Sequence, residues 1–483
     1  MKTLHAIERL AREKPDRIFH VSSGFQSSYS ELSRRSHAVA AHVAREAGPR
    51  QRPVAVIGHK QPEMVQAFIG CLKAGHPYVP IESSMPPARI EAILGNLEKP
   101  LVLTPEIVGA LPEDFTETQM VRNEEIAYVI FTSGSTGEPK GVPISVRNLE
   151  FFIDWIEAEQ RLVNDEVFLN QAPFCFDLSV MDLFPCLHVG GRLVSVTKSH
   201  LADPVALQKL LAESQITTWV STPSFARLCT GNPDFHQQNL MQLRRFLFCG
   251  ETLPPAVAAV LLERFPEAEV WNTYGPTEAT VATTSVRITN DWIAKGGALP
   301  VGIPTPGCRI RILDETLRDV PKSERGQIVI SGPNVSPGYL NPRPNEQPFR
   351  EIDGAWSYCT GDWGHYQDEQ LYFDGRMDSQ IKLNGYRIEI GDIEAHLRSL
   401  ESVRDATVLT IETDGEVTGL TACIIARGEA GSETERILSI RSALRKKLPD
   451  YMLPRHYRFL EEFPMTINGK VDRRALTAIC FSK

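Results

Sequence analysis

The segment Phe131–Val142, FTSGSTGEPKGV, contains the residues best suited to chemistry in this chain. It follows an apolar run, Ile126–Phe131, that the pattern predicts to be a buried strand. Glycines let successive backbone N–H groups point into one concavity, hydroxyls add donors, and Lys140 adds a positive charge. This combination predicts a cradle for phosphate oxygens. The spacing does not match an ordinary P-loop, because Gly134 and Gly137 are too close together and Lys140 is not directly preceded by glycine.

Three further segments contain residues suited to nucleotide chemistry. Tyr274 offers a flat face for a purine ring, and Glu278 offers a hard oxygen ligand for Mg²⁺. Asp362, expected in a turn, can accept hydrogen bonds from both ribose hydroxyls. Lys470 follows a turn-forming Asn-Gly pair, so a tight loop could carry it to a distant site. Each of these signals is weak alone, because exposed glutamates, Asx turns and surface lysines are common.

Size and composition indicate a soluble enzyme of two or three domains. The chain has 483 residues, of which 42% are hydrophobic and 23% are charged. A net charge of -9 argues against a nucleic-acid partner. The nine cysteines include no CxxC pair, and no apolar run approaches membrane-spanning length. We therefore expect a cytoplasmic protein without membrane insertion.

Alternating patterns predict the layers that position these motifs. Pro53–Gly58 and Tyr78–Ile81 have the pattern of buried strands, and Glu63–Ala74 between them has helical spacing. Such alternation predicts layered α/β sheets, largely parallel. Ser145 has the position of a helix N-cap. Gly296–Gly338, rich in Gly, Pro and short β-like runs, predicts a small β subdomain.

The last hundred residues have helix, strand and helix patterns of their own. We place the boundary at Asp378, within a Gly-Arg-Met-Asp segment. Residues 1–377 would form a large N-terminal core, and residues 378–483 would form a smaller α+β C-terminal domain.

The four motifs in this order resemble the adenylate-forming superfamily, which includes amino-acid adenylation domains, acyl-CoA synthetases and luciferases. The resemblance covers essentially the whole chain. It implies that Tyr274 stacks near the adenine, Asp362 holds the ribose, Glu278 binds Mg²⁺ and Lys470 bridges carboxylate and phosphate oxygens. Asp378 would be the hinge. The implied ATP-binding residues are Thr132, Ser133, Gly134, Ser135, Thr136, Gly137, Lys140, Asn272, Tyr274, Gly275, Thr277 and Asp362.

The resemblance implies a reaction in two steps with ATP and Mg²⁺ as cofactors. A carboxylate attacks the α-phosphate of ATP and pyrophosphate leaves; a thiol then displaces AMP to give a thioester. Both first reactants are anionic, so catalysis is mostly positioning and charge neutralisation. Gly385 would line the path of a pantetheine thiol. The chain has no carrier-attachment or condensation motif, so a separate phosphopantetheinyl carrier protein is the expected partner in trans, with CoA as the alternative.

Asp177 indicates which acid is activated. Amino-acid-activating members carry an aspartate after a phenylalanine here, and this chain has Phe176-Asp177. An aspartate at this position pairs with the substrate α-ammonium, because a buried unpaired charge is very costly. The other implied pocket residues could not pair with a charged or strongly polar side chain, so a small apolar substrate is expected. They are Leu178, Met181, Leu247, Cys249, Thr273, Val281 and Ala282.

A narrower resemblance favours D-alanine. Asn170–Asp182, Phe248–Leu253 and Ala279–Val286 are similar to D-alanine–carrier protein ligases. In that family a cysteine at the position of Cys249 crowds one side of the pocket and biases it towards the D enantiomer. The alternatives are a stand-alone adenylation enzyme for L-alanine, L-proline or another small amino acid in natural-product biosynthesis, an acyl-CoA synthetase, and a nucleotide sensor without turnover. Asp177 argues against the synthetase, and the complete set of motifs argues against the sensor.

Overall fold

The computed structural model describes residues 1–113, 117–133, 138–342, 348–377, 380–413, 416–428, 432–465 and 471–481. The chain folds into two compact units. Unit 1 comprises Met1–Ser84, Asn96–Phe131 and Gly141–Met377, and unit 2 comprises Met85–Gly95, Thr132–Lys140 and Asp378–Lys483. No helix in the described part of the chain is both long enough and apolar enough to cross a membrane.

A nine-stranded sheet is the largest element of unit 1. Its central strands, from β12 to β1, are parallel, and antiparallel strands β13, β14 and β2 lie at its edges. In spatial order the strands are β14 (Ile303–Pro304), β13 (Thr284–Ile288), β12 (Glu269–Tyr274), β11 (Arg245–Phe248), β10 (Thr218–Ser221), β8 (Val167–Asn170), β9 (Arg192–Ser195), β1 (Ile18–Ser22) and β2 (Phe25–Ser28).

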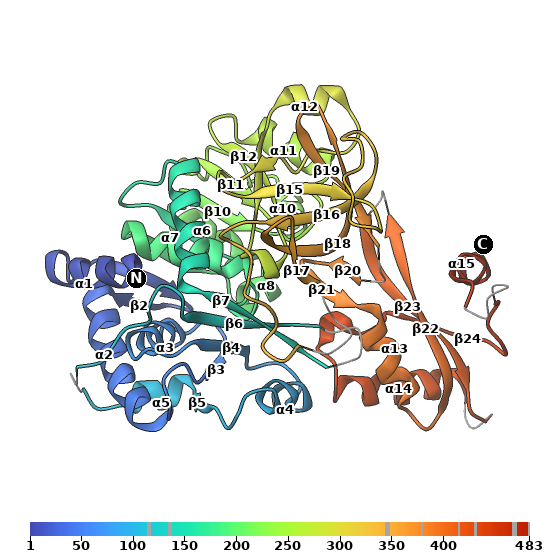
Figure 1. Cartoon of the computed structure of the whole chain (residues 1–483), viewed down its shortest axis with the longest axis horizontal. Coiled ribbons are helices and arrows are strands. Elements are labelled where there is room, and N and C mark those ends of the chain that lie inside the picture. The colour runs from blue at the N-terminus through green and yellow to red at the C-terminus, as the bar shows by residue number, and fades with distance from the viewer. Residues whose placement is uncertain are drawn as a thin grey trace. The chain divides into compact units, whose positions relative to one another are not determined.

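A second, five-stranded sheet contributes the strands that flank the glycine-rich segment. Figure 1 shows its N-terminal strands in blue, with α2, α3 and α5 gathered around them. In spatial order the strands are β5 (Leu101–Leu103), β3 (Val54–Gly58), β4 (Tyr78–Glu82), β6 (Ile126–Thr132) and β7 (Lys140–Ser145). The helices before the third sheet are α1 (Lys2–Glu13), α2 (Tyr29–Glu46), α3 (Pro62–Lys73), α4 (Pro87–Gly95), α5 (Pro105–Ala110), α6 (Val146–Glu159), α7 (Leu178–Val189), α8 (Lys198–Ala202), α9 (Pro204–Glu213), α10 (Pro223–Thr230), α11 (Pro255–Arg264), η1 (Thr277–Ala279) and α12 (Asn290–Lys295).

Helix α7 lies in the core of unit 1. Its apolar residues are not confined to one face, which is typical of a helix enclosed on all sides. Met181 and Phe184 of α7 belong to the same buried cluster as Phe68 of α3 and Phe152 of α6. The core therefore fixes α7 tightly, and with it the residues at its N-terminal end.

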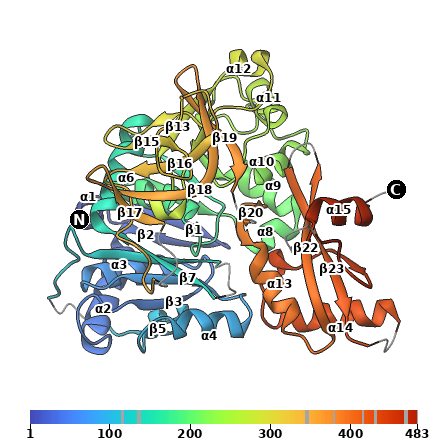
Figure 2. The same ribbon diagram turned by 45° about the vertical axis from the view of Figure 1, so that its right-hand side comes forward.

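A third sheet in unit 1 is antiparallel and follows the two α/β layers in sequence. Figure 2 shows its strands together in yellow and orange. They are β15 (Arg309–Leu313), β16 (Gly326–Ser331), β17 (Phe349–Ile352), β18 (Ala355–Gln367) and β19 (Gln370–Arg376), with the order β15-β16-β18-β17 and with β19 paired to β18.

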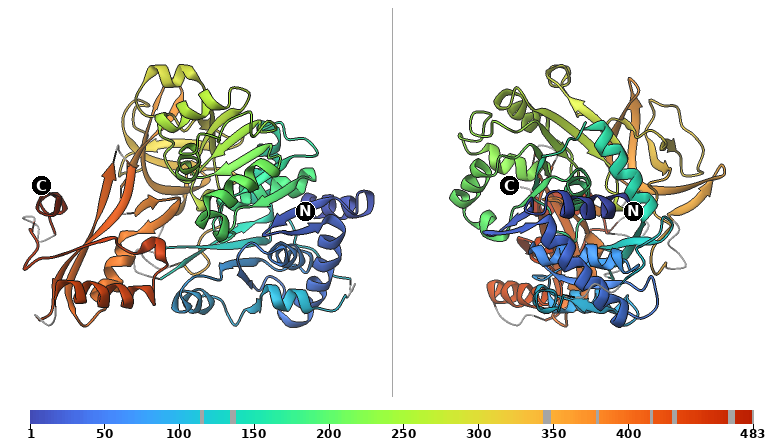
Figure 3. Two further views of the ribbon diagram at one scale, coloured as in Figure 1. Left: turned by 180° about the vertical axis from the view of Figure 1, so that it is seen from behind. Right: turned by 90° about the vertical axis from the view of Figure 1, so that its left-hand side faces the viewer.

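Unit 2 is an α+β unit built on two long antiparallel strands. Helices α13 and α14 cover one face of these strands, and α15 covers the other (Figures 1 and 3). Side chains on one face of the strands pack with Leu444 of α14, and side chains on the other face pack with Leu476 of α15. Its elements from Asp378 onwards are β20 (Gln380–Leu383), β21 (Tyr386–Glu389), α13 (Ile390–Arg398), β22 (Val403–Thr413), β23 (Glu416–Ala426), α14 (Glu433–Arg445), η2 (Asp450–Met452), β24 (His456–Phe459) and α15 (Arg473–Phe481).

These elements confirm the predicted fold class, with layered α/β sheets and a small β subdomain in the larger part and an α+β arrangement in the smaller part. The local predictions were also close. Pro53–Gly58 corresponds to β3, Glu63–Ala74 to α3 and Tyr78–Ile81 to β4. Ser145 caps α6 as predicted, and its hydroxyl accepts a hydrogen bond from the backbone N–H of Asn148.

Candidate active site

The carboxyl ends of parallel strands bring the predicted substrate residues to one edge of the nine-stranded sheet. Asp177 follows β8, Cys249 follows β11 directly, and Glu278 follows β12. Strands β8, β10, β11 and β12 are parallel neighbours in that order. Because the carboxyl ends of such strands face the same way, segments far apart in sequence converge there, which is where ligands bind in open α/β sheets.

The apolar residues predicted to line the amino-acid pocket all belong to the large buried core of unit 1. Leu178 and Met181 come from α7, Cys249 follows β11, and Val281 comes from the turn after η1. The hydroxyl of Thr273 donates to the carbonyl of Phe248 at 2.8 Å and so ties β12 to β11 near these residues. Leu247 and Ala282, also predicted to line the pocket, belong to the same core.

Asp177, the predicted ammonium partner, lies at the N-terminal end of α7. It is half-buried at the N-cap of α7, and its carboxylate does not cap the helix. A negative charge at a helix N-terminus is favoured by the helix dipole. A carboxylate therefore stands at the start of the helix whose apolar residues, Leu178 and Met181, belong to the buried core of unit 1.

The turn after η1 is strained. Thr280 and Val281 have φ angles of 53° and 69°, a region that β-branched residues rarely adopt. The N–H of Ala282 donates to the carbonyl of Thr280 at 2.8 Å, which closes a tight turn around Val281. The carbonyl of Val281 accepts a hydrogen bond from the Cys249 thiol at 3.5 Å. Gly275 is needed here because a Cβ at its position would lie 2.5 Å from Cα of Ala282.

Residues 332–338, which we call the strap, hold this turn and η1. The N–H of Ser336 donates to the carbonyl of Glu278 at 2.9 Å. Asn334, which is 1% exposed, donates from Nδ2 to the carbonyl of Ala279 and to Oγ1 of Thr283. Sequence reasoning missed both residues, because their partners are 51 to 58 positions away in the chain.

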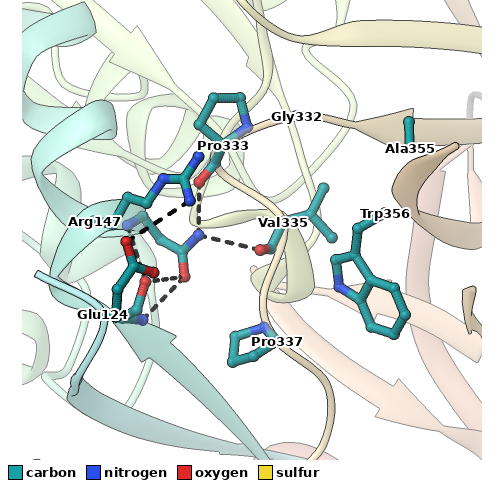
Figure 4. Close-up of a pocket in the computed structure, with 10 residues that line it drawn as sticks. Glu124, Arg147, Gly332, Pro333, Val335, Pro337, Ala355 and Trp356 are labelled. Carbon is teal, nitrogen blue, oxygen red and sulfur yellow. Dashed lines mark hydrogen bonds and ion pairs between the residues drawn. The ribbon is translucent and has the colours of Figure 1, made fainter. Parts of the chain in front are cut away.

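The strap also lines a pocket of about 460 Å³ that is separate from the predicted amino-acid pocket. Figure 4 shows Arg147 and Glu124 on one side of it and Trp356 on the other, with Pro333, Val335 and Pro337 of the strap between them. Within this pocket Asn148 donates to the carbonyls of Pro333 and Val335. The strap is therefore fixed on both sides.

Glu278 is suited to hold Mg²⁺ together with ATP phosphates. Its side chain is fully buried, and Oε1 accepts a hydrogen bond from the Tyr339 hydroxyl at 2.8 Å. Mg²⁺ is usually bound by one or two carboxylates, with phosphates and water completing its shell. A single oriented carboxylate therefore fits the ion, although no cluster of three or more possible metal ligands occurs among the described residues. Sequence reasoning did not identify Tyr339.

Asp362 lies in strand β18 rather than in the predicted turn. The prediction of a turn at Asp362 was wrong. Gly361 has φ of 72°, and the register between β18 and β19 is irregular next to it, so the strand bends here but does not reverse direction. The Asp362 carboxylate, 5% exposed, accepts hydrogen bonds from the Tyr274 hydroxyl at 2.5 Å and from Arg376 Nη1 at 2.6 Å. The structure thus brings two of the predicted nucleotide residues, Tyr274 and Asp362, into direct contact.

Tyr274 is almost completely buried. Burial and the charge of Asp362 raise the pKa of its phenol well above the usual value, so the group is a stable hydrogen-bond donor. One face of its ring packs with Phe373, at 6.1 Å between ring centroids. Its stacking on adenine stays a prediction. Of the other nucleotide residues, Asn272 donates from Nδ2 to the carbonyl of Pro300, and Thr277 begins η1.

Lys60 is a further buried residue at the sheet edge that sequence reasoning missed. Its Nζ donates to the carbonyls of Asn170 and Gln171 at 2.7 and 2.8 Å, where β8 ends and the segment leading to Asp177 begins. The side chain is 1% exposed, and burial lowers its pKa to about 7, against the opposing effect of the Asp182 charge. Lys60 therefore anchors the start of the segment that leads to Asp177.

The glycine-rich segment is described only at its ends. Thr132 ends β6, Ser133 is buried directly after it, and Lys140 begins β7. Gly385 has φ of 82° in the two-residue loop between β20 and β21, where Asn384 has φ of 52°. This is the pattern of a type I′ hairpin turn. The predicted residues Gly134, Ser135, Thr136, Gly137, Asp378 and Lys470 lie outside the described residues.

Comparison with known proteins gives matches over nearly the whole chain. The family model "AMP-binding enzyme" matches residues 7–120 and 107–340, and "AMP-binding enzyme C-terminal domain" matches residues 392–470. D-alanine–D-alanyl carrier protein ligases of Bacillus licheniformis and Listeria welshimeri are each 42% identical to this chain. The first match covers 99% of both chains, and the second covers 98% of this chain and 99% of the relative.

Solved structures with low sequence identity share the fold. The adenylation domain AlmE of Vibrio cholerae, solved with glycyl-adenosine-5′-phosphate, has a TM-score of 0.84 at 22% identity, covering 100% of this chain and 97% of that one. The o-succinylbenzoate CoA synthetase of Bacillus subtilis has a TM-score of 0.85 at 20% identity, covering 98% of each. These findings confirm the predicted resemblance, and the chain belongs to the AMP-binding enzyme family of adenylate-forming ligases.

Proposed function

We propose that this ligase activates D-alanine as D-alanyl-AMP and transfers the D-alanyl group to the phosphopantetheine thiol of a separate carrier protein. The observation that carries this proposal is the place of Leu178, Met181, Cys249 and Val281 in the buried core of unit 1, at or after the carboxyl ends of its parallel strands, with Asp177 at the start of α7. The apolar character of these residues suits a methyl side chain and offers no partner to a charged one. Relatives that are 42% identical are named for the same reaction.

In the first step the alanine carboxylate attacks the α-phosphate of ATP, which forms alanyl-AMP and releases pyrophosphate. Asp177 pairs with the α-ammonium and directs the carboxylate towards the nucleotide. Asp362, oriented by Tyr274 and Arg376, accepts hydrogen bonds from the ribose hydroxyls. Lys470 bridges the attacking carboxylate and the phosphate oxygens. These groups act by positioning and by neutralising charge, since both reactants are anionic.

Magnesium fits this site through Glu278. When bound, the ion would neutralise phosphate charge and lower the cost of bringing two anions together. Glu278 is held for this task by the Tyr339 hydroxyl on its side chain and by the Ser336 N–H on its backbone carbonyl. The phosphates themselves would be held by residues 132–140, whose hydroxyls, N–H groups and lysine match their oxygens.

The second step requires a thiol from another molecule. Residues 1–377 act as the core that binds ATP and alanine, and residues 378–483 act as a mobile domain that turns about Asp378. In the rotated arrangement, the loop that carries Gly385 lines the path of the pantetheine arm. The enzyme acts as a cytoplasmic monomer, and the carrier protein binds in trans.

Amino-acid-dependent ATP–pyrophosphate exchange tests the first step. D-Ala, L-Ala, Gly, L-Ser and L-Pro are compared in parallel with purified enzyme, ATP and Mg²⁺. Strong preference for D-Ala supports the proposal. Preference for an L residue would retain the adenylation chemistry but refute D-alanine as the substrate.

Thioester formation tests the second step. Radiolabelled D-alanine is supplied with ATP and one of three acceptors, namely holo-carrier protein, carrier protein without phosphopantetheine, and CoA. Label on holo-carrier protein alone supports transfer to a carrier in trans. Equal transfer to CoA would show that the carrier is not specifically recognised.

A further inference from the structure

We propose that Asn334 is a positioning residue that sets the preference for D-alanine over L-alanine by holding the Thr280–Val281 turn against the pocket. This inference rests on the proposed function, because it concerns the amino-acid pocket of the same reaction. Asn334 is not among the residues that the motifs identify, and its hydrogen bonds are made with Ala279, Thr280, Thr283 and Cys308. Its effect is exerted through the turn.

Asn334 is bonded to that turn from several directions. Its Nδ2 donates to the carbonyl of Ala279 at 3.0 Å and to Oγ1 of Thr283 at 2.8 Å. Its backbone carbonyl accepts from the Thr280 hydroxyl at 2.7 Å. On the other side, its Oδ1 accepts from the Cys308 thiol at 3.0 Å. One buried side chain thus joins the residues immediately before and after the turn.

The turn needs such support because its own backbone is strained. Thr280 and Val281 are β-branched, and both have positive φ angles. Conformations of this kind persist only where the surroundings enforce them, and they are concentrated at functional sites. Without the bonds to Ala279 and Thr283, rotation of the turn towards ordinary backbone angles would become favourable. The Val281 carbonyl and side chain would then move.

Val281 connects the turn to residues predicted to line the substrate pocket. Its carbonyl accepts a hydrogen bond from the Cys249 thiol, and its side chain lies in the buried core of unit 1, to which Leu178 and Met181 also belong. D- and L-alanine differ only by the exchange of a methyl group and a hydrogen on the α-carbon. If Val281 moves away from the pocket by less than the radius of a methyl group, L-alanine can enter as well. Packed cores respond to changes of this size.

The chemistry of an amide explains why asparagine suits this position. The group presents two donors and one acceptor in a plane, and the contacts above use both kinds. Aspartate keeps the acceptor but cannot donate when ionised, and its charge would face the carbonyl of Ala279. Alanine removes both. These two substitutions therefore separate the loss of donation from the loss of the whole side chain.

The test compares kcat/KM for D-alanine and L-alanine in ATP–pyrophosphate exchange. The variants are Asn334→Asp, Asn334→Ala and Thr283→Val, which removes only the hydroxyl that accepts from the amide. Gln237→Ala is the matched control, because the Gln237 amide also donates two hydrogen bonds, in this case to the backbone carbonyls of Leu240 and Leu243, away from the site. Thermal unfolding of each variant reports the general loss of stability.

The expected result is a fall of roughly tenfold or more in the D:L ratio for both Asn334 variants, comparable with discrimination over a single methylene. Thr283→Val should lower the ratio by a smaller factor, and Gln237→Ala should leave it unchanged. Unchanged ratios in Asn334→Asp and Thr283→Val, with both enantiomers losing activity equally, would overturn the inference. Because Thr283→Val preserves side-chain shape, it decides the question even if the Asn334 variants do not fold.

The wild-type enzyme separates this inference from the proposed function. If the wild type favours D-alanine and the variants keep its ratio, the positioning role fails and the function stands. If the wild type favours an L residue and the variants change its ratio, D-alanine fails as the substrate and the positioning role stands.

Discussion

Removing the hydroxyl of Tyr339 should weaken the response of the enzyme to Mg²⁺. The hydroxyl donates at 2.8 Å to Oε1 of Glu278, whose side chain is fully buried. Tyr339→Phe keeps the ring, which packs edge-on against Phe349 at 5.2 Å between centroids. The substitution therefore removes one donor to the carboxylate and little of the packing.

The size of the effect follows from the charge of the acceptor. A hydrogen bond to a charged group contributes about 1.5–3 kcal/mol. Because each 1.4 kcal/mol changes an equilibrium tenfold, the concentration of Mg²⁺ at half-maximal rate should rise about 10- to 100-fold. Loss of a hydrogen bond to a metal ligand has the same typical cost in metal affinity, about 10- to 100-fold.

The assay is ATP–pyrophosphate exchange with D-alanine, with free Mg²⁺ varied at a fixed ATP concentration. Tyr29→Phe is the matched control, because the Tyr29 hydroxyl is also buried in unit 1 but donates to the carbonyl of Gly191. Tyr339→Phe should recover most of the wild-type rate at saturating Mg²⁺, and Tyr29→Phe should keep the wild-type dependence. A reduced rate with an unchanged half-saturating Mg²⁺ concentration would refute the reasoning.

Four other substitutions test separate parts of the site. Asp177→Ala should abolish amino-acid activation yet leave ATP binding nearly intact by calorimetry; retained alanine-dependent exchange would contradict the ammonium pairing. Lys470→Ala should reduce adenylate formation by about 10²-fold or more, whereas thioester transfer from preformed D-alanyl-AMP survives; equal loss of both would show that its role is misassigned. Gly275→Ala should reduce exchange at least tenfold, because the new Cβ would lie 2.5 Å from Cα of Ala282. Burial lowers the pKa of Lys60 to about 7 from 10.5, so the folded protein binds this proton less tightly than the unfolded chain does. The stability of the wild type should therefore increase as pH rises from 7 towards 10.5. Any stability advantage of Lys60→Met should shrink over that range, and a constant difference in melting temperature between the two proteins would refute the pKa shift.

Much of the fold could be predicted because its signals are local. Alternating apolar runs identified β3, β4 and β6, and Ser145 marked the start of α6 within one residue. Each of these depends on the periodicity of a short segment or on one capping hydrogen bond. Asp362 was misplaced for the opposite reason. A Gly-Asp pair favours a turn locally, but pairing with β16 and β19 keeps it within a long strand.

The apolar residues predicted to line the pocket were named from the sequence. Leu178, Met181, Cys249 and Val281 were identified through motifs, and the structure places all four in the buried core of unit 1. The motifs locate them because strand ends in a parallel sheet converge on one edge. The sequence does not reveal, however, that the Val281 backbone is strained or that its carbonyl contacts the Cys249 thiol.

The residues that position the site could not be found in this way, and the reason lies in their partners. Lys60 bonds to backbone carbonyls, which every residue possesses, so its partner positions have no characteristic residue type. The side chain of Asn334 bonds to Ala279, Thr283 and Cys308, which lie 26 to 55 positions away. Tyr339 bonds to Glu278 across 61 positions of sequence. Such contacts appear only when the chain is folded. A functional site read from motifs therefore identifies the groups that meet the substrate, whereas the groups that hold them in place must be taken from the structure.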